Sequence, residues 1–110
     1  MAQLRTLLVD DDADQRRLVR ALLERAGIGP VIEASDADSG LAAATEHAPE
    51  LILLDIEMPG RTGLEVLPDL LDAAPGARVV VLSNFPRRRL GAVALARGAV
   101  GYVEKRVEPG

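Results

Sequence analysis

Residues 51–67, LILLDIEMPGRTGLEVL, place an apolar run, an acidic turn and a helix signal one after another. The run LILL has no polar side chain, as expected of a strand that is buried on both faces of a sheet. Asp55 ends this run, and Thr62 with Glu65 has the spacing of a capping box that opens a helix. Pro68 lies inside that helix and is expected to bend or loosen its first turns, because proline removes one hydrogen bond.

Apolar runs and helix signals alternate in the same way along the rest of the chain. Five short runs are rich in aliphatic residues, so we expect five strands, over residues 4–9, 31–34, 51–54, 78–83 and 100–103. Helix-opening residues follow the first four runs: Asp12 with Gln15, Ser35 with Asp38, Thr62 with Glu65, and Pro86. Parallel neighbours need a crossover connection, and helices supply it here, so the sequence predicts an α/β fold around a parallel sheet.

The composition describes one compact domain. The 110 residues are 48% hydrophobic, with 13 basic and 17 acidic side chains and a net charge of −4. This mixture excludes a disordered chain, and the absence of cysteine excludes disulfide, cysteine-zinc and thiol chemistry. The N-terminal apolar run is too short for a signal peptide and no stretch is long enough to span a membrane, so we expect a soluble, cytoplasmic protein. The acidic balance argues against binding of nucleic-acid phosphates as the main function.

No helix is predicted after the fifth strand. The first helix carries an apolar stripe that includes Leu18 and Leu22, but residues 107–110 add no second helix beside it. We therefore expect a single domain, residues 1–110, that is truncated at its C-terminus or covered there by another molecule. The uncovered sheet face, or the fourth helix, is then expected to allow self-association.

Polar side chains gather where the predicted strands end. Parallel strands share one carboxyl edge, and ligands of open α/β sheets bind there. This edge is expected to collect Asp10, Asp11, Asp55, Ser83, Asn84 and Lys105. Carboxylates without histidine or cysteine beside them suit Mg²⁺, which completes its octahedron with water, carbonyl and phosphate oxygens. Such a set fits phosphoryl transfer to a carboxylate nucleophile, and the chain has no P-loop motif that would bind a nucleotide phosphate.

Other charged residues are open to simpler interpretations. Asp12 is expected to be a helix cap, and His47 a solvated residue at a helix end. Residues 87–89 are three consecutive arginines, which form either the solvent-exposed face of the fourth helix or a basic patch that binds a partner or nucleic acid. Lys105 is the single lysine of the chain, and the other 12 basic residues are arginines. Its compact ammonium is suited to contact a phosphoryl oxygen at a crowded edge of the sheet.

Four segments in order, LLVDDDADQRRLV, DIEMPGRTGLEVL, VVVLSN and GAVGYVEK, resemble the receiver domains of response regulators in two-component signalling. The resemblance covers essentially the whole chain. It implies a flavodoxin-like, doubly wound sheet of five parallel strands in the order 2-1-3-4-5, here without the final helix. It also implies a phosphorelay switch that acts as an enzyme only on its own phosphorylation and dephosphorylation. Contact with nucleic acid would need an output domain that this chain lacks.

The resemblance implies a chemical role for the acidic residues and the lysine. Asp55 is expected to be the phosphoacceptor, which takes a phosphoryl group from a histidine kinase or phosphotransfer protein. Mg²⁺ is expected to be held by Asp10, Asp11, Asp55 and the backbone carbonyl of Glu57. Lys105 is expected to contact the phosphoryl group.

The resemblance also implies which residues respond to phosphorylation. Ser83 is expected to be the switch hydroxyl that moves to the phosphoryl oxygen, and Tyr102 the aromatic that turns inward afterwards, unless it simply packs in the core. The chain also departs from the family's pattern, because Asn84 and Phe85 are bulkier than the small residues that often follow the switch hydroxyl, and Glu57 adds a negative side chain at the mouth of the site. These three residues are expected to control access to the phosphoryl group and to slow its hydrolysis.

Two other classes of protein compete with this interpretation. VDDDA fits the D-x-D pattern of haloacid-dehalogenase-like, magnesium-dependent phosphohydrolases, with Asp10 as nucleophile and Asp12 as general acid. That class leaves DIEMPG unexplained, and the acidic pair it needs after Lys105 is absent. The other alternative is a degenerate receiver-like module used only for binding, against which the intact acidic set argues.

Overall fold

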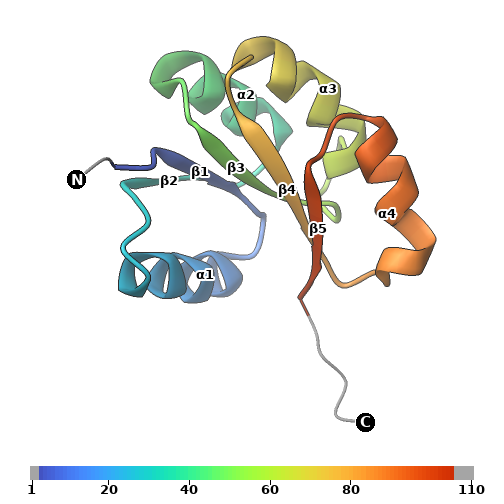
Figure 1. Ribbon diagram of the computed structural model, residues 1–110, viewed down its shortest axis with the longest axis horizontal. Coiled ribbons are helices and arrows are strands. Elements are labelled where there is room, and N and C mark those ends of the chain that lie inside the picture. The colour runs from blue at the N-terminus through green and yellow to red at the C-terminus, as the bar shows by residue number, and fades with distance from the viewer. Residues whose placement is uncertain (1–2, 106–110) are drawn as a thin grey trace, which may run out of the picture.

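The computed structural model describes residues 3–105 and shows a three-layer α/β domain (Figure 1). Five parallel strands form one sheet in the order β2-β1-β3-β4-β5, which confirms the predicted fold. In chain order the elements are β1 (Thr6–Val9), α1 (Ala13–Arg25), β2 (Val31–Ala34), α2 (Ala37–His47), β3 (Leu51–Asp55), α3 (Gly63–Ala73), β4 (Arg78–Ser83), α4 (Arg87–Ala96) and β5 (Gly101–Glu104). Within residues 3–105, no helix is long and apolar enough to cross a membrane.

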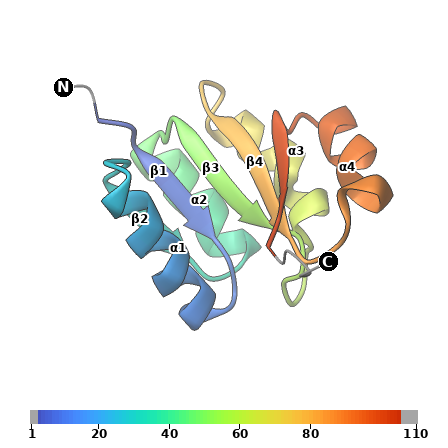
Figure 2. The ribbon, with the colours of Figure 1, turned by 60° about the horizontal axis from the view of Figure 1, so that its bottom comes forward.

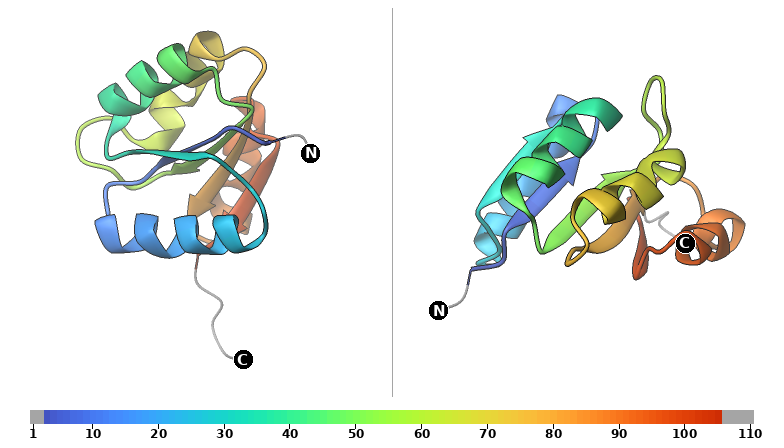
Figure 3. Two further views of the ribbon diagram at one scale, coloured as in Figure 1. Left: turned by 90° about the vertical axis from the view of Figure 1, so that its left-hand side faces the viewer. Right: turned by 90° about the horizontal axis from the view of Figure 1, so that it is seen from above.

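The sheet separates two hydrophobic cores of unequal size. Helices α2, α3 and α4 pack on one face of the sheet and α1 packs on the other (Figures 1 and 3). The larger core joins fully buried strand residues such as Leu54 and Val81 to Leu67 of α3. The smaller core holds Leu8 and Leu53 beneath α1. β3 and the central residues of β1 and β4 are therefore apolar on both faces, which explains the continuous hydrophobic runs in these strands.

The face that carries α1 is only partly covered. Among residues 3–105, α1 is the only helix on this face, and it lies beside β1 and β2 rather than β4 and β5 (Figure 1). Leu18 and Leu22 of α1 are both 55% exposed, and Val103 of β5 is 47% exposed. Self-association through this apolar face remains a prediction.

Helix starts differ from the predicted ones in two places. Asp36, not Ser35, caps α2, because its side chain accepts a hydrogen bond from the backbone N–H of Ser39 while the Ser39 hydroxyl accepts one from the N–H of Asp36. Pro86 is the N-cap of α4 instead of its first helical residue. Asp36 is the cap of α2 because its bond with Ser39 is reciprocal, whereas α4 begins one residue after Pro86 because the backbone of Pro86 is extended, with a ψ of 141°.

Pro68 does not interrupt α3, which runs without a break from Gly63 to Ala73. Proline has no N–H to donate to the carbonyl of Leu64, four residues earlier. That carbonyl accepts a hydrogen bond from the Arg97 guanidinium at 2.9 Å instead. The arginine at the end of α4 thus satisfies the group that the proline leaves free, and the predicted loosening of the helix is not seen.

Candidate functional site

Three buried charged side chains meet at the carboxyl ends of β1, β3 and β5, which lie along one edge of the sheet (Figure 2). The Lys105 ammonium donates a hydrogen bond to Asp10 Oδ2 at 2.9 Å and lies 3.1 Å from Asp55 Oδ1. The three side chains are at most 6% exposed. The sheet order therefore brings together residues that are up to 95 positions apart in the sequence.

A cluster of three carboxylates forms beside this lysine. One carboxylate oxygen from each of Asp10, Asp11 and Asp55 lies within 4.8 Å of the other two, and Asp11 is exposed. Oxygen ligands of this kind suit a hard divalent cation such as Mg²⁺, and a cation would relieve the repulsion between the charges. The same residues line an acidic pocket of about 430 Å³, together with Asp12, Gln15, Glu57, Asn84 and Lys105.

The turn between β1 and α1 holds Asp10 and Asp12 through hydrogen bonds with backbone N–H groups. Asp10 Oδ1 accepts a hydrogen bond from the backbone N–H of Asp12, and Asp12 in turn caps α1 by accepting from two N–H groups of its first turn. The prediction that Asp12 is a cap is thus confirmed. The guanidinium of Arg16 also donates to the carbonyl of Asp10 at 2.6 Å. Sequence reasoning missed this contact, because Arg16 resembles any other charged residue of an exposed helix face.

A glycine holds the loop after β3 against the site. A Cβ at Gly63 would overlap the carbonyl oxygen of Asp55, so only glycine allows α3 to start this close to the end of β3. The backbone N–H of Gly63 donates to the carbonyl of Ile56 at 2.9 Å. The N–H of Glu57 points to Asp55 Oδ1 at 3.4 Å, while the position of the Glu57 carbonyl as a metal ligand remains a prediction.

Burial and charge set the protonation of Asp55 and Lys105. Burial, together with the charge of Asp10, raises the pKa of Asp55 from 3.8 to about 6, although the ammonium of Lys105 opposes this shift. Burial alone would lower the pKa of Lys105, but the carboxylates of Asp10 and Asp55 outweigh it and raise that pKa. At neutral pH the site therefore holds a charged lysine and an ionised Asp55 that is easily protonated on acidification.

The raised pKa of Asp55 predicts a pH-dependent difference in stability between the metal-free protein and its Asp55→Asn variant. The folded protein holds the proton of Asp55 up to about pH 6, whereas the unfolded chain releases it near pH 4. The parent should therefore lose free energy of unfolding relative to the variant as the pH rises through this window. Urea unfolding of both proteins in EDTA measures the difference, and a difference independent of pH would show that Asp55 titrates normally.

Ser83 and Tyr102 do not line the acidic pocket, but both form hydrogen bonds with Phe85 in the loop that follows β4. The Ser83 hydroxyl is fully buried and accepts a hydrogen bond from the N–H of Phe85 at 2.9 Å. Tyr102 is 5% exposed, packs in the larger core, and donates its hydroxyl to the carbonyl of Phe85 at 2.8 Å. The structure therefore places Tyr102 inward, in contact with the loop that follows Ser83.

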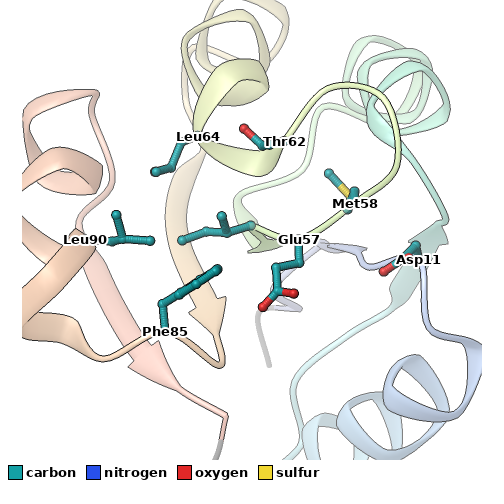
Figure 4. A pocket seen from close by; sticks show the side chains of 8 residues that line it. Asp11, Glu57, Met58, Thr62, Leu64, Phe85 and Leu90 are labelled. Carbon is teal, nitrogen blue, oxygen red and sulfur yellow. The ribbon is translucent and has the colours of Figure 1, made fainter.

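A second, apolar pocket of about 590 Å³ adjoins the acidic one (Figure 4). Phe85, Leu64 and Leu90 form its apolar walls, and Asp11 and Glu57 lie on one side of it. Among the residues expected to control access, Glu57 and Asn84 line the acidic pocket, whereas Phe85 lines this neighbouring one. His47, at the end of α2, and the arginines at residues 87–89 line neither pocket.

A model of the response regulator receiver domain matches residues 6–110. The chain belongs to the response regulator receiver domain family. Receiver domains are the signalling domains of two-component systems, so the resemblance stated from the sequence is confirmed. The order of the strands agrees with this family membership.

Individual relatives agree with this assignment. The nitrate/nitrite response regulator protein NarL of Escherichia coli (strain K12) is 41% identical over 104 residues, which make up 94% of this receiver domain and 48% of NarL. A CheY-like receiver domain protein of Methanospirillum hungatei JF-1 superposes with a TM-score of 0.86 at 30% identity, over 98% of this chain and 86% of that one.

A response regulator of Burkholderia pseudomallei was solved with a phosphorylated aspartic acid and a calcium ion. It superposes with a TM-score of 0.86 at 27% identity, over 96% of this receiver domain and 62% of that chain. The receiver domain spans between 26% and 48% of the length of the first curated relatives that it matches. Their remaining length is outside the similarity.

Proposed function

We propose that this receiver domain is a switch that accepts a phosphoryl group on Asp55 from the phosphohistidine of a histidine kinase or phosphotransfer protein. The observation that carries the proposal is the hydrogen bonding of the two buried aspartates. Both carboxylate oxygens of Asp10 are engaged, one by the N–H of Asp12 and one by Lys105. In the described part of the chain, only Oδ1 of Asp55 has such partners, so its Oδ2 is free to act as a nucleophile.

The reaction needs an ionised carboxylate and a way to neutralise the incoming charge. Asp55 Oδ2 would attack the phosphorus, the P–N bond would break with its electron pair going to the imidazole, and an acyl phosphate would form. Mg²⁺ bound by Asp10, Asp11 and Asp55 would supply positive charge to the phosphoryl oxygens. Lys105, already 3.1 Å from Asp55 Oδ1, would hold a further oxygen of the same group.

The loop after β4 would detect the product. The Ser83 hydroxyl, at the end of β4, accepts a hydrogen bond from the N–H of Phe85 in the following loop, and a move of this hydroxyl to a phosphoryl oxygen would release that N–H and shift the loop. Tyr102 would stabilise the shifted loop through the carbonyl of Phe85. Glu57 and Asn84, which line the acidic pocket, would limit the approach of water and so lengthen the life of the acyl phosphate.

The phosphorylated aspartic acid and the calcium ion of the Burkholderia pseudomallei regulator support this proposal. The phosphohydrolase alternative needs Asp10 as nucleophile, and the full hydrogen bonding of its carboxylate speaks against that role. We further propose that the switch acts in the cytoplasm and controls an output that lies outside this chain.

Matched variants of neighbouring aspartates test the proposed magnesium chemistry. Asp11→Asn should lower the rate of labelling by acetyl phosphate at limiting Mg²⁺ at least tenfold, because it removes one of the three clustered carboxylates. Asp12→Asn should label like the parent, since asparagine caps a helix as well as aspartate does. Labelling that persists in EDTA, or equal loss in both variants, would contradict the proposal.

A further inference from the structure

Helix α4 begins without the features that usually stabilise a helix start. Its N-cap, Pro86, offers no side-chain acceptor, and its first turn contains three arginines and no acidic residue. Positive charge is unfavourable beside the exposed N–H groups and the positive end of the helix dipole. The N-cap and the first turn of α4 therefore supply neither a side-chain acceptor nor a negative charge to the helix N-terminus.

Glu104, the last residue of β5, provides the missing acceptor. Its Oε1 accepts a hydrogen bond from the backbone N–H of Arg87 at 2.7 Å, across 17 positions of sequence. The Arg87 guanidinium donates in turn to the carbonyl of Tyr102 at 2.9 Å. Two hydrogen bonds thus connect the start of α4 to β5, and the one from Glu104 places a negative charge at the helix N-terminus.

The same short stretch of β5 reaches the phosphorylation site. Glu104 directly precedes Lys105, whose ammonium binds Asp10 and lies beside Asp55. The backbone N–H of Lys105 donates to the carbonyl of Ser83 at 2.7 Å. The cap of α4 and the lysine of the site are therefore consecutive residues on one backbone, so a shift of this backbone segment would move both.

We propose that Glu104 is a positioning residue that couples the phosphorylation state of Asp55 to the N-terminus of α4. The coupling rests on the proposed function of Asp55. When the Lys105 ammonium moves to contact the phosphoryl group, the adjacent Glu104 shifts and its hydrogen bond with the N–H of Arg87 changes. The first turn of α4 then becomes more or less stable. Tyr102 moves with it, because Arg87 and the loop carbonyl of Phe85 both bind this residue.

Three variants separate this role from ordinary capping. Glu104→Ala removes the acceptor, and Glu104→Gln keeps a neutral acceptor of the same shape. Glu65→Ala is the matched control, because Glu65 accepts from the N–H of Thr62 at 2.9 Å and caps α3 with no link to the lysine. The probe is beryllofluoride with Mg²⁺, a mimic of the phosphoryl group. Its binding is measured by calorimetry, and the response by amide exchange of residues 87–90 and by tyrosine fluorescence.

Tyrosine fluorescence reports on a single residue here, because the chain has one tyrosine and no tryptophan. Glu104→Ala should bind beryllofluoride within about twofold of the parent, while amide exchange at the start of α4 speeds up about fivefold, as for a lost cap. It should also lose most of the Tyr102 fluorescence change on binding. Glu104→Gln should partly restore the slow amide exchange and the Tyr102 fluorescence change. Glu65→Ala should leave the exchange at the start of α4 and the fluorescence change as in the parent.

The outcomes distinguish the coupling from the function on which it rests. A parent protein that does not bind beryllofluoride would overturn the proposed function, and the coupling with it. If the parent binds and Glu104→Ala shows the same exchange and the same Tyr102 change, the coupling alone is overturned. Faster exchange with an unchanged Tyr102 response would likewise overturn it, because Glu104 would then be only a cap.

Discussion

Asparagine in place of Asp55 is expected to abolish acyl-phosphate formation completely while leaving the fold intact. The amide lacks the negative charge and the nucleophilic oxygen that the reaction needs. It keeps a carbonyl oxygen that can accept from Lys105, and it removes one of the three clustered carboxylates, so unfolding is not expected. The measurement is labelling by acetyl phosphate with Mg²⁺, beside circular dichroism of the same sample.

The control for this variant is Asp12→Asn, which makes the same chemical change to a residue of the same pocket that serves as a helix cap. It should label at the rate of the parent. Undiminished labelling of Asp55→Asn would mean that another group is the nucleophile, and Asp10 would be the first to consider.

Methionine in place of Lys105 is expected to cost about 3 to 5 kcal/mol of unfolding free energy in the absence of metal, as for the loss of one partner of a buried ion pair. The substitution leaves Asp10 and Asp55 buried together without a cation, and both are at most 6% exposed. Mg²⁺ should restore much of the loss, since a bound divalent ion supplies the missing positive charge. Chemical denaturation with and without Mg²⁺ measures both effects.

Arg17→Met is the matched control, because the ion pair of Arg17 with Asp14 lies on the surface, where both side chains are more than 80% exposed. Its loss should leave the stability nearly unchanged with or without Mg²⁺. Equal stability of Lys105→Met and the parent in EDTA would contradict the view that the lysine neutralises the aspartates.

The architecture could be predicted from local sequence because short aliphatic-rich runs alternate with helix-opening residues along the chain. Leu51 to Leu54 has no polar residue, and a run of this length is typical of a strand that is buried on both faces of a parallel sheet. The residues at the strand ends then had to meet at one edge, and the structure places Asp10, Asp55 and Lys105 in contact there. The aspartates and the lysine of the site were therefore accessible to sequence reasoning.

What the sequence did not reveal are contacts between elements that local patterns do not connect. The Arg16 contact with the carbonyl of Asp10, the Arg97 contact with the carbonyl of Leu64, and the Glu104 cap on α4 each join a charged side chain to a backbone group elsewhere in the fold. The sequence pattern around an exposed arginine or glutamate does not indicate which group its side chain contacts. Such contacts depend on the relative positions of elements, which only the structure supplies.

The most direct test of the account is to locate the phosphoryl group. The protein is phosphorylated with acetyl phosphate and Mg²⁺ and then treated with borohydride, which reduces an acyl phosphate to an alcohol and leaves ordinary carboxylates unchanged. Peptide sequencing by mass spectrometry should find the reduced residue at Asp55 and at no other aspartate. Reduction at Asp10 instead would contradict the account and favour a hydrolase that uses Asp10 as its nucleophile.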